Sequence, residues 1–306
     1  MKRLLIGIVL LVIFLVAAVY LFIPAKLNVS VTTNMNAAMP AVSRMLSDEN
    51  NWKKFWPGDA PFALDGKTYS IRGKYFSVFN IGITSGSVTT NSGLNLILLK
   101  PDLMAINWNT EYITGSNPVE RFSNYRKARA ARKNMNVILE KIKQFMEKTE
   151  NIYGFTIRYT KVTDSVLIST RRNFNRQPTN LEVEEMIQSL KKYIAANNAI
   201  EKNSPMLNIF RVSDTNYEAM TAIAVDKRLP LTNEFAPKFL LKGGNILEGE
   251  IKGGPATIEN ALQEIENYRA DHKYTSPAIP FQLLVTDRVK ELDTAKWITR
   301  LFYPVF

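Results

Sequence analysis

The sequence predicts an α+β protein with two domains behind a single N-terminal transmembrane helix. Three observations lead to this prediction. The first 25 residues contain an unbroken apolar run, the following stretch passes from several strand-like runs into a long amphipathic helix, and the last half repeats one order of strand, helix, strand and strand. A length of 306 residues also suits about two domains.

Composition argues against several kinds of catalytic and metal site. The chain has no cysteine and a single histidine, His272, so disulfides and thiolate chemistry are excluded. A zinc site or a serine-type triad needs more histidine or cysteine than this chain offers. We therefore expect no cofactor, no metal site and no assigned catalytic residue. An enzyme built on this chain would rely on carboxylates, Tyr, Lys or Arg.

The apolar run at residues 4–23 predicts contact with a membrane. As a helix it is long enough to cross about 30 Å of hydrocarbon. Lys2 and Arg3 precede it and Lys26 follows, so the positive-inside bias predicts a single-pass protein of the cell (inner) membrane with a cytoplasmic N-terminus and extracytoplasmic domains. The alternative is a cleaved signal peptide, whose apolar region is normally only about 7–15 residues.

The first predicted domain covers residues 26–150, after an anchor at residues 1–25. Residues 27–35 alternate apolar and polar side chains like a strand with one buried face, and a short helix with a tryptophan-rich turn at Pro57 and Gly58 follows. The further predicted strands are 68–76, 80–89, 94–99 and 105–112.

A long helix closes this domain. Apolar residues recur at steps of three and four from Phe122 to Phe145, which predicts one buried stripe. Most of the net charge of +11 lies between Arg121 and Lys148. A solvated helix face and a surface for anionic lipid headgroups both explain these cations. We expect no nucleic-acid partner, because no DNA-binding helix pair is visible.

The order of elements and two short motifs in this domain resemble the START-like or polyketide-cyclase-like (SRPBCC) superfamily. The motifs are the stretch from Asn36 to Val42 and the pattern Asn51-Trp52 followed by Phe55-Trp56-Pro57. The resemblance implies a helix-grip fold, in which a curved sheet wraps around the long helix and encloses an apolar cavity. Trp52 and Trp108 are candidates to line that cavity, and the alternative is that both belong to the core.

The second predicted domain, residues 151–306, contains an internal repeat. The first half reads as a strand at 155–170, a helix at 181–196 and strands at 205–212 and 217–225. The second half reads as a strand at 245–254, a helix at 256–269 and strands at 279–288 and 297–305. The two helices carry matching apolar stripes. A duplication of this kind predicts a pseudo-twofold pair with a cleft where the halves meet.

The second domain resembles the GyrI-like (SOUL-like) small-molecule-binding domain, which is also the effector-binding module of multidrug-sensing transcription regulators. The resemblance rests on Gly244-Asn245 with Gly249, on Gly253-Gly254-Pro255, and on the two stretches that end at Phe281 and at Val305. It implies binding of flat, often cationic organic molecules between the halves, anchored by a glutamate four residues before the terminal proline. A few relatives are hydrolases that use the same glutamate.

Arg300 occupies that glutamate position here. In a strand, Ile298, Arg300 and Phe302 share one face. If this face lines the cleft, the guanidinium would hold a carboxylate or phosphate ligand. The alternative is an internal ion pair with Glu248 or Glu250. Two aromatic residues, Phe281 and Tyr217, complete the predicted binding site.

These observations predict a membrane-anchored extracytoplasmic protein that binds a small organic ligand, either anionic or hydrophobic. The alternative is a hydrolase or cyclase that uses a carboxylate in the cleft. Loss of the glutamate at position 300 favours binding over turnover. Neither the ligand nor the oligomeric state follows from the sequence.

Overall fold

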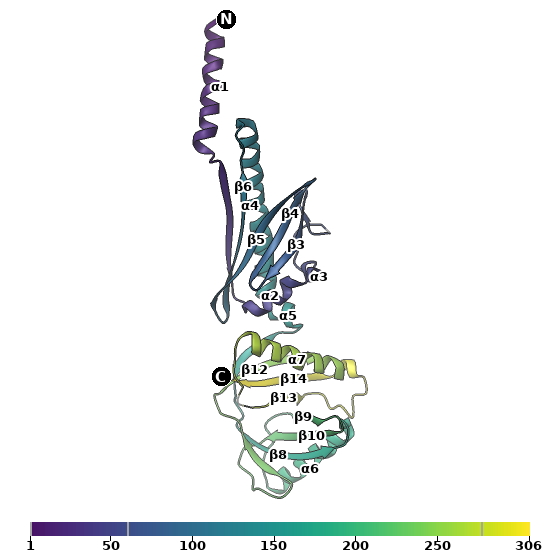
Figure 1. Ribbon diagram of the computed structural model, residues 1–306. Coiled ribbons are helices and arrows are strands. Elements are labelled where there is room, and N and C mark those ends of the chain that lie inside the picture. Colours follow the sequence, from purple (N-terminus) through teal and green to yellow (C-terminus); the bar gives the residue numbers. More distant parts are fainter. Residues whose placement is uncertain (1, 60, 277) are drawn as a thin grey trace. The chain divides into compact units, whose positions relative to one another are not determined.

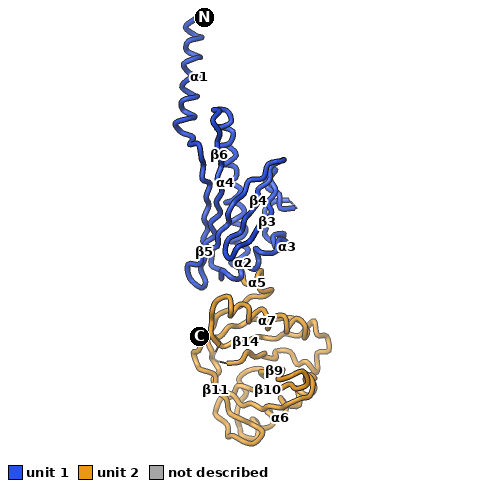
Figure 2. The backbone as a smooth tube through the Cα atoms, in the orientation of Figure 1, with its two compact units in different colours: residues 1–148 blue, residues 149–306 orange. Residues whose placement is uncertain are grey.

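The computed structural model describes residues 2–59, 61–276 and 278–306. The chain folds into two compact units, residues 1–148 and residues 149–306 (Figure 2). Both units are mixed α+β structures with one antiparallel sheet each.

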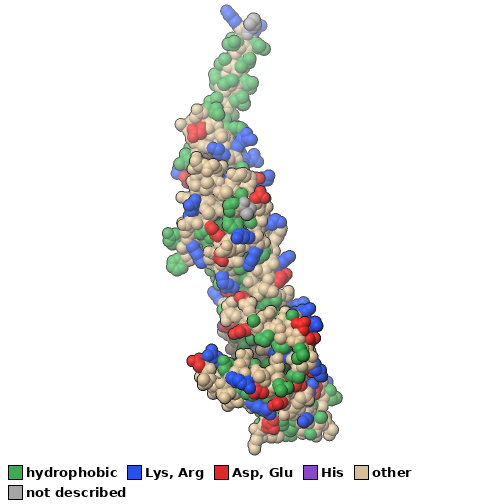
Figure 3. All heavy atoms as spheres, turned by 90° about the vertical axis from the view of Figure 1, so that its right-hand side faces the viewer, with side chains coloured by type: hydrophobic (Ala, Val, Ile, Leu, Met, Phe, Trp, Pro, Cys, Tyr) green, Lys and Arg blue, Asp and Glu red, His purple; other side chains and the backbone are tan. Residues whose placement is uncertain are grey.

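Helix α1, Lys2–Phe22, is apolar from Leu4 onward, and Figure 3 shows hydrophobic side chains along the face of the helix in view. None of its residues is buried, and Leu21 and Phe22 are each 81% exposed. A long helix with apolar residues on all its faces and none of them buried is unlike a core helix. Its length and composition are sufficient to span a membrane.

Unit 1 contains a six-stranded sheet in the order β1-β6-β5-β4-β3-β2, with α2, α3 and α4 beside it (Figure 1). The sheet is antiparallel throughout. Its strands are β1 (Lys26–Met35), β2 (Ala63–Leu64), β3 (Lys67–Tyr75), β4 (Val78–Ser85), β5 (Val88–Lys100) and β6 (Leu103–Ile113); its helices are α2 (Met39–Ser47), α3 (Glu49–Trp52) and α4 (Pro118–Met146).

Helix α4 begins where the sequence provides both a cap and a favourable first residue. The Asn117 side chain accepts hydrogen bonds from the backbone N–H groups of Val119 and Glu120, and Pro118 occupies the first turn. The buried stripe runs from Ala128 to Met146 and packs along β1 and β6. This arrangement confirms the predicted helix-grip fold.

One predicted strand of unit 1 is wrong. The sequence pattern favours a single strand over residues 80–89, whereas β4 ends at Ser85 and β5 begins at Val88. Gly86 lies between them with φ +58°, a left-handed conformation that glycine adopts without strain. The glycine therefore turns the chain inside a run that reads as one strand.

Unit 2 contains an eight-stranded antiparallel sheet in the order β11-β8-β10-β9-β13-β14-β12-β7. The strands are β7 (Ile157–Lys161), β8 (Val166–Phe174), β9 (Met206–Ser213), β10 (Asn216–Ala224), β11 (Ala236–Phe239), β12 (Asn245–Lys252), β13 (Phe281–Leu284) and β14 (Ile298–Val305). The helices are α5 (Thr149–Tyr153), α6 (Asn180–Ala196), α7 (Pro255–Asp271) and a 3₁₀ turn, η1 (Thr294–Lys296).

The predicted duplication is confirmed by this strand order. Strands β8, β10 and β9 mirror β12, β14 and β13 about the middle of the sheet, and each set follows the order strand, helix, strand, strand along the chain. The predicted strand at 155–170 is wrong, because the chain divides there into β7 and β8. Strand β7 pairs with β12 of the other half, and β11 pairs with β8, so the two halves exchange their leading strands.

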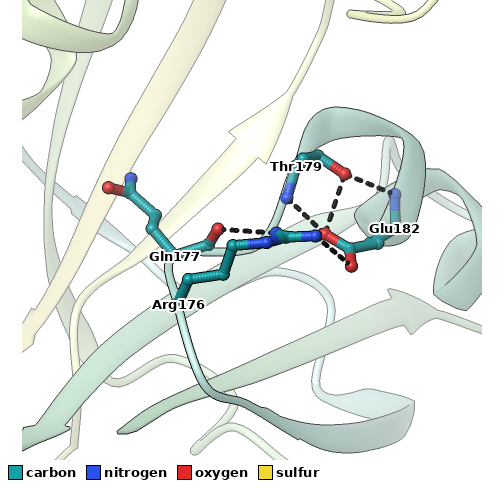
Figure 4. Close-up of polar contacts among 4 residues, drawn as sticks. All are labelled: Arg176, Gln177, Thr179 and Glu182. Carbon is teal, nitrogen blue, oxygen red and sulfur yellow. Dashed lines mark hydrogen bonds and ion pairs between the residues drawn. The ribbon is translucent and has the colours of Figure 1, made fainter. Parts of the chain in front are cut away.

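Helix α6 begins with a capping box (Figure 4). The Glu182 backbone N–H donates to Thr179 Oγ1 at 3.3 Å, and the Thr179 N–H donates to Glu182 Oε2 at 2.7 Å. Arg176 also donates to both carboxylate oxygens, at 2.8 and 2.9 Å. These hydrogen bonds, first those from Arg176, lower the pKa of Glu182 to about 2.

The sheet of unit 2 has an apolar cluster on each face. One face packs against the buried stripe of α6, with Ile168, Leu207, Ile223 and Leu284 as its strand residues. Residues that alternate with these point to the other face and form a smaller cluster. That second cluster consists of Leu167, Met206, Ala222, Ala224 and Leu283, with Leu240, Phe281 and Phe302 packed against it.

Candidate functional site

A cavity of about 300 Å³ lies in unit 2, on the sheet face opposite α6. Both halves of the repeat contribute to it, the first through the β7–β8 connection and β9, the second mainly through β12, β13 and β14. Its apolar lining residues are Val162, Met206, Leu240, Ile246, Phe281, Leu283 and Phe302, and its polar ones are Thr160, Lys161, Thr163, Asp164, Asn203, Glu248 and Arg300.

Arg300 forms an internal ion pair in this cavity. Its Nε donates to Glu248 Oε1 at 3.0 Å, and its Nη2 donates to the same oxygen. The side chains of Arg300 and Glu248 are 34% and 18% exposed, so the pair is partly shielded from water. Of the two predicted partners for the guanidinium, the structure therefore shows the protein carboxylate.

Glu250, the residue directly opposite Arg300 in the strand register, is not its partner. Glu248 lies opposite Phe302, and the guanidinium carbon of Arg300 sits 5.2 Å from the centroid of the Phe302 ring. This cation–π contact directs the Arg300 side chain along the strand toward Glu248, the residue opposite Phe302. Glu250 remains exposed.

The ion pair leaves hydrogen-bonding capacity unused. Both bonds from Arg300 end on Oε1 of Glu248, so Oε2 keeps its acceptor capacity and Nη1 of Arg300 keeps its donors. Among the described residues, no further partner bonds either group. The charges cancel, yet the Nη1 group of Arg300 and the Oε2 atom of Glu248 keep hydrogen-bonding capacity for a ligand.

An aromatic pair forms the apolar part of the site. The Phe281 and Phe302 rings stack with centroids 5.3 Å apart and planes 19° from parallel. Strand pairing places them together, because Phe281 lies directly opposite Phe302. Met206 and Leu283 continue this surface. The result is a flat apolar wall next to a neutralised charge pair.

The structure brings together four of the residues predicted for this site and separates the rest. Arg300, Phe302, Glu248 and Phe281 line the cavity. Ile298 shares the Arg300 face but lies at the start of β14 opposite Lys252, Glu250 points to solvent, and Tyr217 lies on β10; none of these three is among the described lining residues.

Several lining residues were not predicted from the sequence, for an identifiable reason. Residues 160–164 read as the middle of one strand, whereas Thr160 and Lys161 end β7, residues 162–164 begin the connection to β8, and all five border the cavity. Leu283 and Met206 follow from the register, because Leu283 lies opposite both Arg300 and Met206. Strand pairing is the signal that would have found them.

Trp52 and Trp108 belong to the core of unit 1. They are 5% and 2% exposed, and Trp52 stacks on Trp56 with ring centroids 5.8 Å apart. Their indole N–H groups are bonded inside the protein, Trp52 to the Leu46 carbonyl at 3.0 Å and Trp108 to Ser92 Oγ at 2.9 Å. Both rings therefore have the satisfied contacts expected of core tryptophans.

Tyr69 lies beside Trp108 in the same core, with ring centroids 6.0 Å apart. Its side chain is almost fully buried, and burial raises the pKa of its phenol to about 12. The Asn134 amide lies 3.3 Å from the Tyr69 hydroxyl.

A second cavity in unit 2, of about 400 Å³, contains an arginine that lacks a carboxylate partner. It lies between α6 and residues 284–290, and Arg288 borders it. Arg288 Nη2 donates to Gln282 Oε1 and Thr299 Oγ1, both at 2.9 Å, and the guanidinium carbon lies 5.0 Å from the Trp297 ring centroid. Within the described ranges no acid pairs with it, and burial lowers its pKa to about 10. No sequence pattern pointed to this residue.

No cluster of three or more His, Asp or Glu side chains suited to a metal ion occurs within residues 2–59, 61–276 and 278–306.

No protein-family model matches the sequence, and no curated protein matches it significantly. Several solved structures are similar to parts of the chain. The EcmrR C-terminal domain is 13% identical, with a TM-score of 0.42, and the similarity covers 50% of this chain and 98% of that domain. A hydrolase from Listeria innocua is 10% identical with a TM-score of 0.38, over 49% of this chain and 91% of the hydrolase. The di-domain ARO/CYC BexL from the BE-7585A biosynthetic pathway is 8% identical with a TM-score of 0.33, over 92% of this chain and 85% of BexL.

Proposed function

We propose that this chain is a membrane-anchored protein that binds a small organic molecule in the cavity lined by Phe281, Phe302, Glu248 and Arg300. The observation that supports this function best is the combination of a stacked aromatic wall with a charge pair in which Arg300 Nη1 and Glu248 Oε2 have no hydrogen-bond partner among the described residues. Ligand sites commonly have this composition, with mostly apolar lining and a few placed polar groups.

The ion pair favours an overall neutral ligand over an anion. An anionic ligand would have to compete with Glu248 for the guanidinium, and a cation would have to compete with Arg300 for the carboxylate. A neutral, flat aromatic molecule with one amide-like group would have to displace neither Glu248 nor Arg300 from the ion pair. Its ring would lie on Phe281 and Phe302, while its N–H and C=O groups bond Glu248 Oε2 and Arg300 Nη1.

The role of α1 in this proposal is to anchor the binding domain to a membrane. The apolar residues 4–22, none of which is buried, and the two cations Lys2 and Arg3 at the beginning of the helix support this role. By the positive-inside bias, both units lie outside the cytoplasm.

Binding is preferred to turnover because both carboxylates that line the cavity already have protein partners. The Arg300 guanidinium holds Glu248 by two hydrogen bonds, and the Asn203 amide donates to Asp164 Oδ2 at 3.4 Å. A general base has to be directed at a proton of the substrate, whereas these carboxylates are directed at groups of the protein. The proposed protein therefore carries, senses or sequesters its ligand.

The test is a thermal-shift screen of the full chain in detergent against three matched sets of flat aromatic compounds: amides, carboxylates and ammonium compounds. We expect amides to raise the melting temperature most. Phe302→Ala should remove this shift, and Glu248→Gln should reduce it. Glu250→Gln, an identical change two residues away on the same strand, should leave it unchanged. A shift that survives Phe302→Ala would place the ligand elsewhere.

A further inference from the structure

The C-terminal end of α1 is tied to the beginning of α4 and to the loop before it. Arg121 Nε donates to the Ile23 carbonyl at 2.7 Å, and its guanidinium carbon lies 4.9 Å from the Tyr20 ring centroid. The Tyr20 hydroxyl donates to the Ser116 carbonyl. Residues 113–122 therefore lie beside the point where α1 ends (Figure 1).

Three large apolar side chains are exposed on this segment. Ile113, Val119 and Phe122 are 71%, 77% and 49% exposed. All three belong to residues 113–122, which lie beside the C-terminal end of α1, the helix that is long and apolar enough to span a membrane. Contact with the interfacial region of a bilayer would remove their apolar surface from water.

Cations without carboxylate partners follow on α4. Residues 121–139 include no Asp or Glu. The five exposed cations of this stretch are Arg126, Lys127, Arg129, Arg132 and Lys133, and no acid in the described part of the chain pairs with any of them. Figure 3 shows Lys and Arg side chains on the surface just beyond α1. Unpaired cations of this kind suit anionic lipid headgroups.

The direction of α4 orders these cations by their distance from α1. Helix α4 runs beside β1, since Arg121 bonds Ile23 just before β1 and Glu147 Oε1 accepts a hydrogen bond from the Asn36 N–H just after it. At about 1.5 Å per residue, Arg126 and Lys127 lie about 8–9 Å beyond Arg121, and Arg132 and Lys133 about 17–18 Å beyond it. A headgroup layer is about 5–8 Å thick, and screening limits attraction to about 8 Å at physiological salt.

We propose that Ile113, Val119, Phe122, Arg126 and Lys127 form a juxtamembrane surface that binds the anionic headgroups of the bilayer crossed by α1. The apolar residues enter the interface, and the two cations hold lipid phosphates. Arg132 and Lys133 lie too far out to contribute equally. This inference rests on the proposed membrane anchor and applies to either orientation of α1.

Lipid-selective quenching tests the surface directly. Because the chain has no cysteine, a fluorophore can be attached to a single introduced one, Phe122→Cys, in the full chain reconstituted into phosphatidylcholine and phosphatidylglycerol vesicles mixed in equal parts. One of the two lipids is brominated in each sample. We expect brominated phosphatidylglycerol to quench the fluorophore about 3–10-fold more effectively than brominated phosphatidylcholine. Arg126→Gln with Lys127→Gln should bring this ratio close to one, and Arg132→Gln with Lys133→Gln should lower it much less.

The label position has its own control. Phe76 is 99% exposed and follows β3 at the end of the sheet far from the beginning of β1. A label at Phe76→Cys should be quenched by neither lipid. Melting temperatures in detergent that match the wild type show that each variant is folded.

The outcomes separate the surface from the anchor. Vesicle flotation that resists alkaline carbonate, together with equal quenching by the two lipids, would retain the anchor and overturn the juxtamembrane surface. If the two double variants, Arg126→Gln with Lys127→Gln and Arg132→Gln with Lys133→Gln, lower the quenching ratio equally, the proposed ordering along α4 is wrong. The assignment of Arg126 and Lys127 would then be overturned with it. A chain that does not float with vesicles would overturn the anchor and the surface together.

Discussion

The ion pair between Arg300 and Glu248 explains why a strand of bulky apolar residues contains a guanidinium. The pair is partly shielded, so its removal should have an effect between that of an exposed pair, about 0–1 kcal/mol, and that of a buried one, about 3–5 kcal/mol. Arg300 also keeps its contact with the Phe302 ring. The strand thus accommodates the charge because a partner and an aromatic face both meet it.

We expect Arg300→Met to lower the free energy of unfolding by about 1–3 kcal/mol, because it leaves the Glu248 carboxylate without its donor. Glu248→Gln should have a comparable effect, and the double variant should lose less than the sum of the two. Urea unfolding of the four proteins gives this coupling. Glu250→Gln serves as the control and should be nearly neutral; an equal loss there would show that Arg300 interacts with both glutamates.

Tyr69 provides a pH signature for the core of unit 1. Its folded-state pKa of about 12 exceeds the ordinary value of 10.0, because burial disfavours the phenolate. The corresponding stability is present below about pH 10 and is lost as the pH rises toward 12. Between pH 10 and 12 the free energy of unfolding of Tyr69→Phe should therefore fall by up to about 2 kcal/mol less than that of the wild type. Unfolding measured from pH 9 to 12 should show a shallower slope for the variant, and parallel slopes would contradict the buried assignment.

At the scale of elements, the beginning of α6 depends on a network that the sequence encodes locally. Thr179 and Glu182 have the spacing of a capping box, and Arg176 precedes them in the same turn of chain. Thr179→Ala should destabilise unit 2 by about 1 kcal/mol, because the Glu182 backbone N–H loses its acceptor. Chemical unfolding compared with the wild type measures this loss.

The same network predicts a pH dependence in acid. The pKa of Glu182 is lowered from 4.5 to about 2, so its stabilising contribution is present above about pH 4.5 and is lost as the pH falls toward 2. Glu182→Gln should flatten the acid side of the stability profile. Glu185→Gln, the same charge change on an exposed position of α6, should not. An unchanged profile in the first variant would mean that the network does not persist in solution.

Strands β7 and β11 show how the repeat of unit 2 is closed. Each precedes the first strand of its own half along the chain, yet each pairs with the first strand of the other half. The exchange covers both edges of the six central strands. It also places the connection at residues 162–165 beside the cavity that Arg300 lines.

At the scale of the whole molecule, the order of charges around α1 predicts its orientation. Lys2 and Arg3 begin the helix and precede its apolar run, and only Lys26 follows it closely. An alkaline phosphatase fused to the C-terminus should therefore be active in a bacterial host, and the fusion should sediment with membranes. Activity of a cytoplasmic reporter at the same position, instead of the phosphatase, would reverse the orientation.

The two units should also fold independently. The hydrogen bonds of the cavity and of the α6 cap lie within residues 149–306. The first helix of unit 2 is bonded to its first strand, since Thr149 Oγ1 accepts from the Ile157 N–H at 3.1 Å. A fragment of residues 149–306 should unfold cooperatively in urea with native-like circular dichroism. A fragment that stays unfolded while residues 26–306 are stable would show that the units share one core.

The sequence by itself determined the features that depend on local pattern. The apolar run, the stripe of α4 and the duplicated order of elements follow from side-chain periodicity. These were sufficient for the fold class and for the shared face of Arg300 and Phe302. They also limited Arg300 to two kinds of partner.

Only the tertiary structure decided which distant groups meet. The choice of Glu248 over Glu250 depends on antiparallel register and on the lean of Arg300 over Phe302. Trp108 became a core residue through its contact with the Tyr69 ring on another strand, and Arg288 became a buried cation because residues 282, 297 and 299 surround it. Register and burial arise when separate segments pack together, so no window of neighbouring residues contains them.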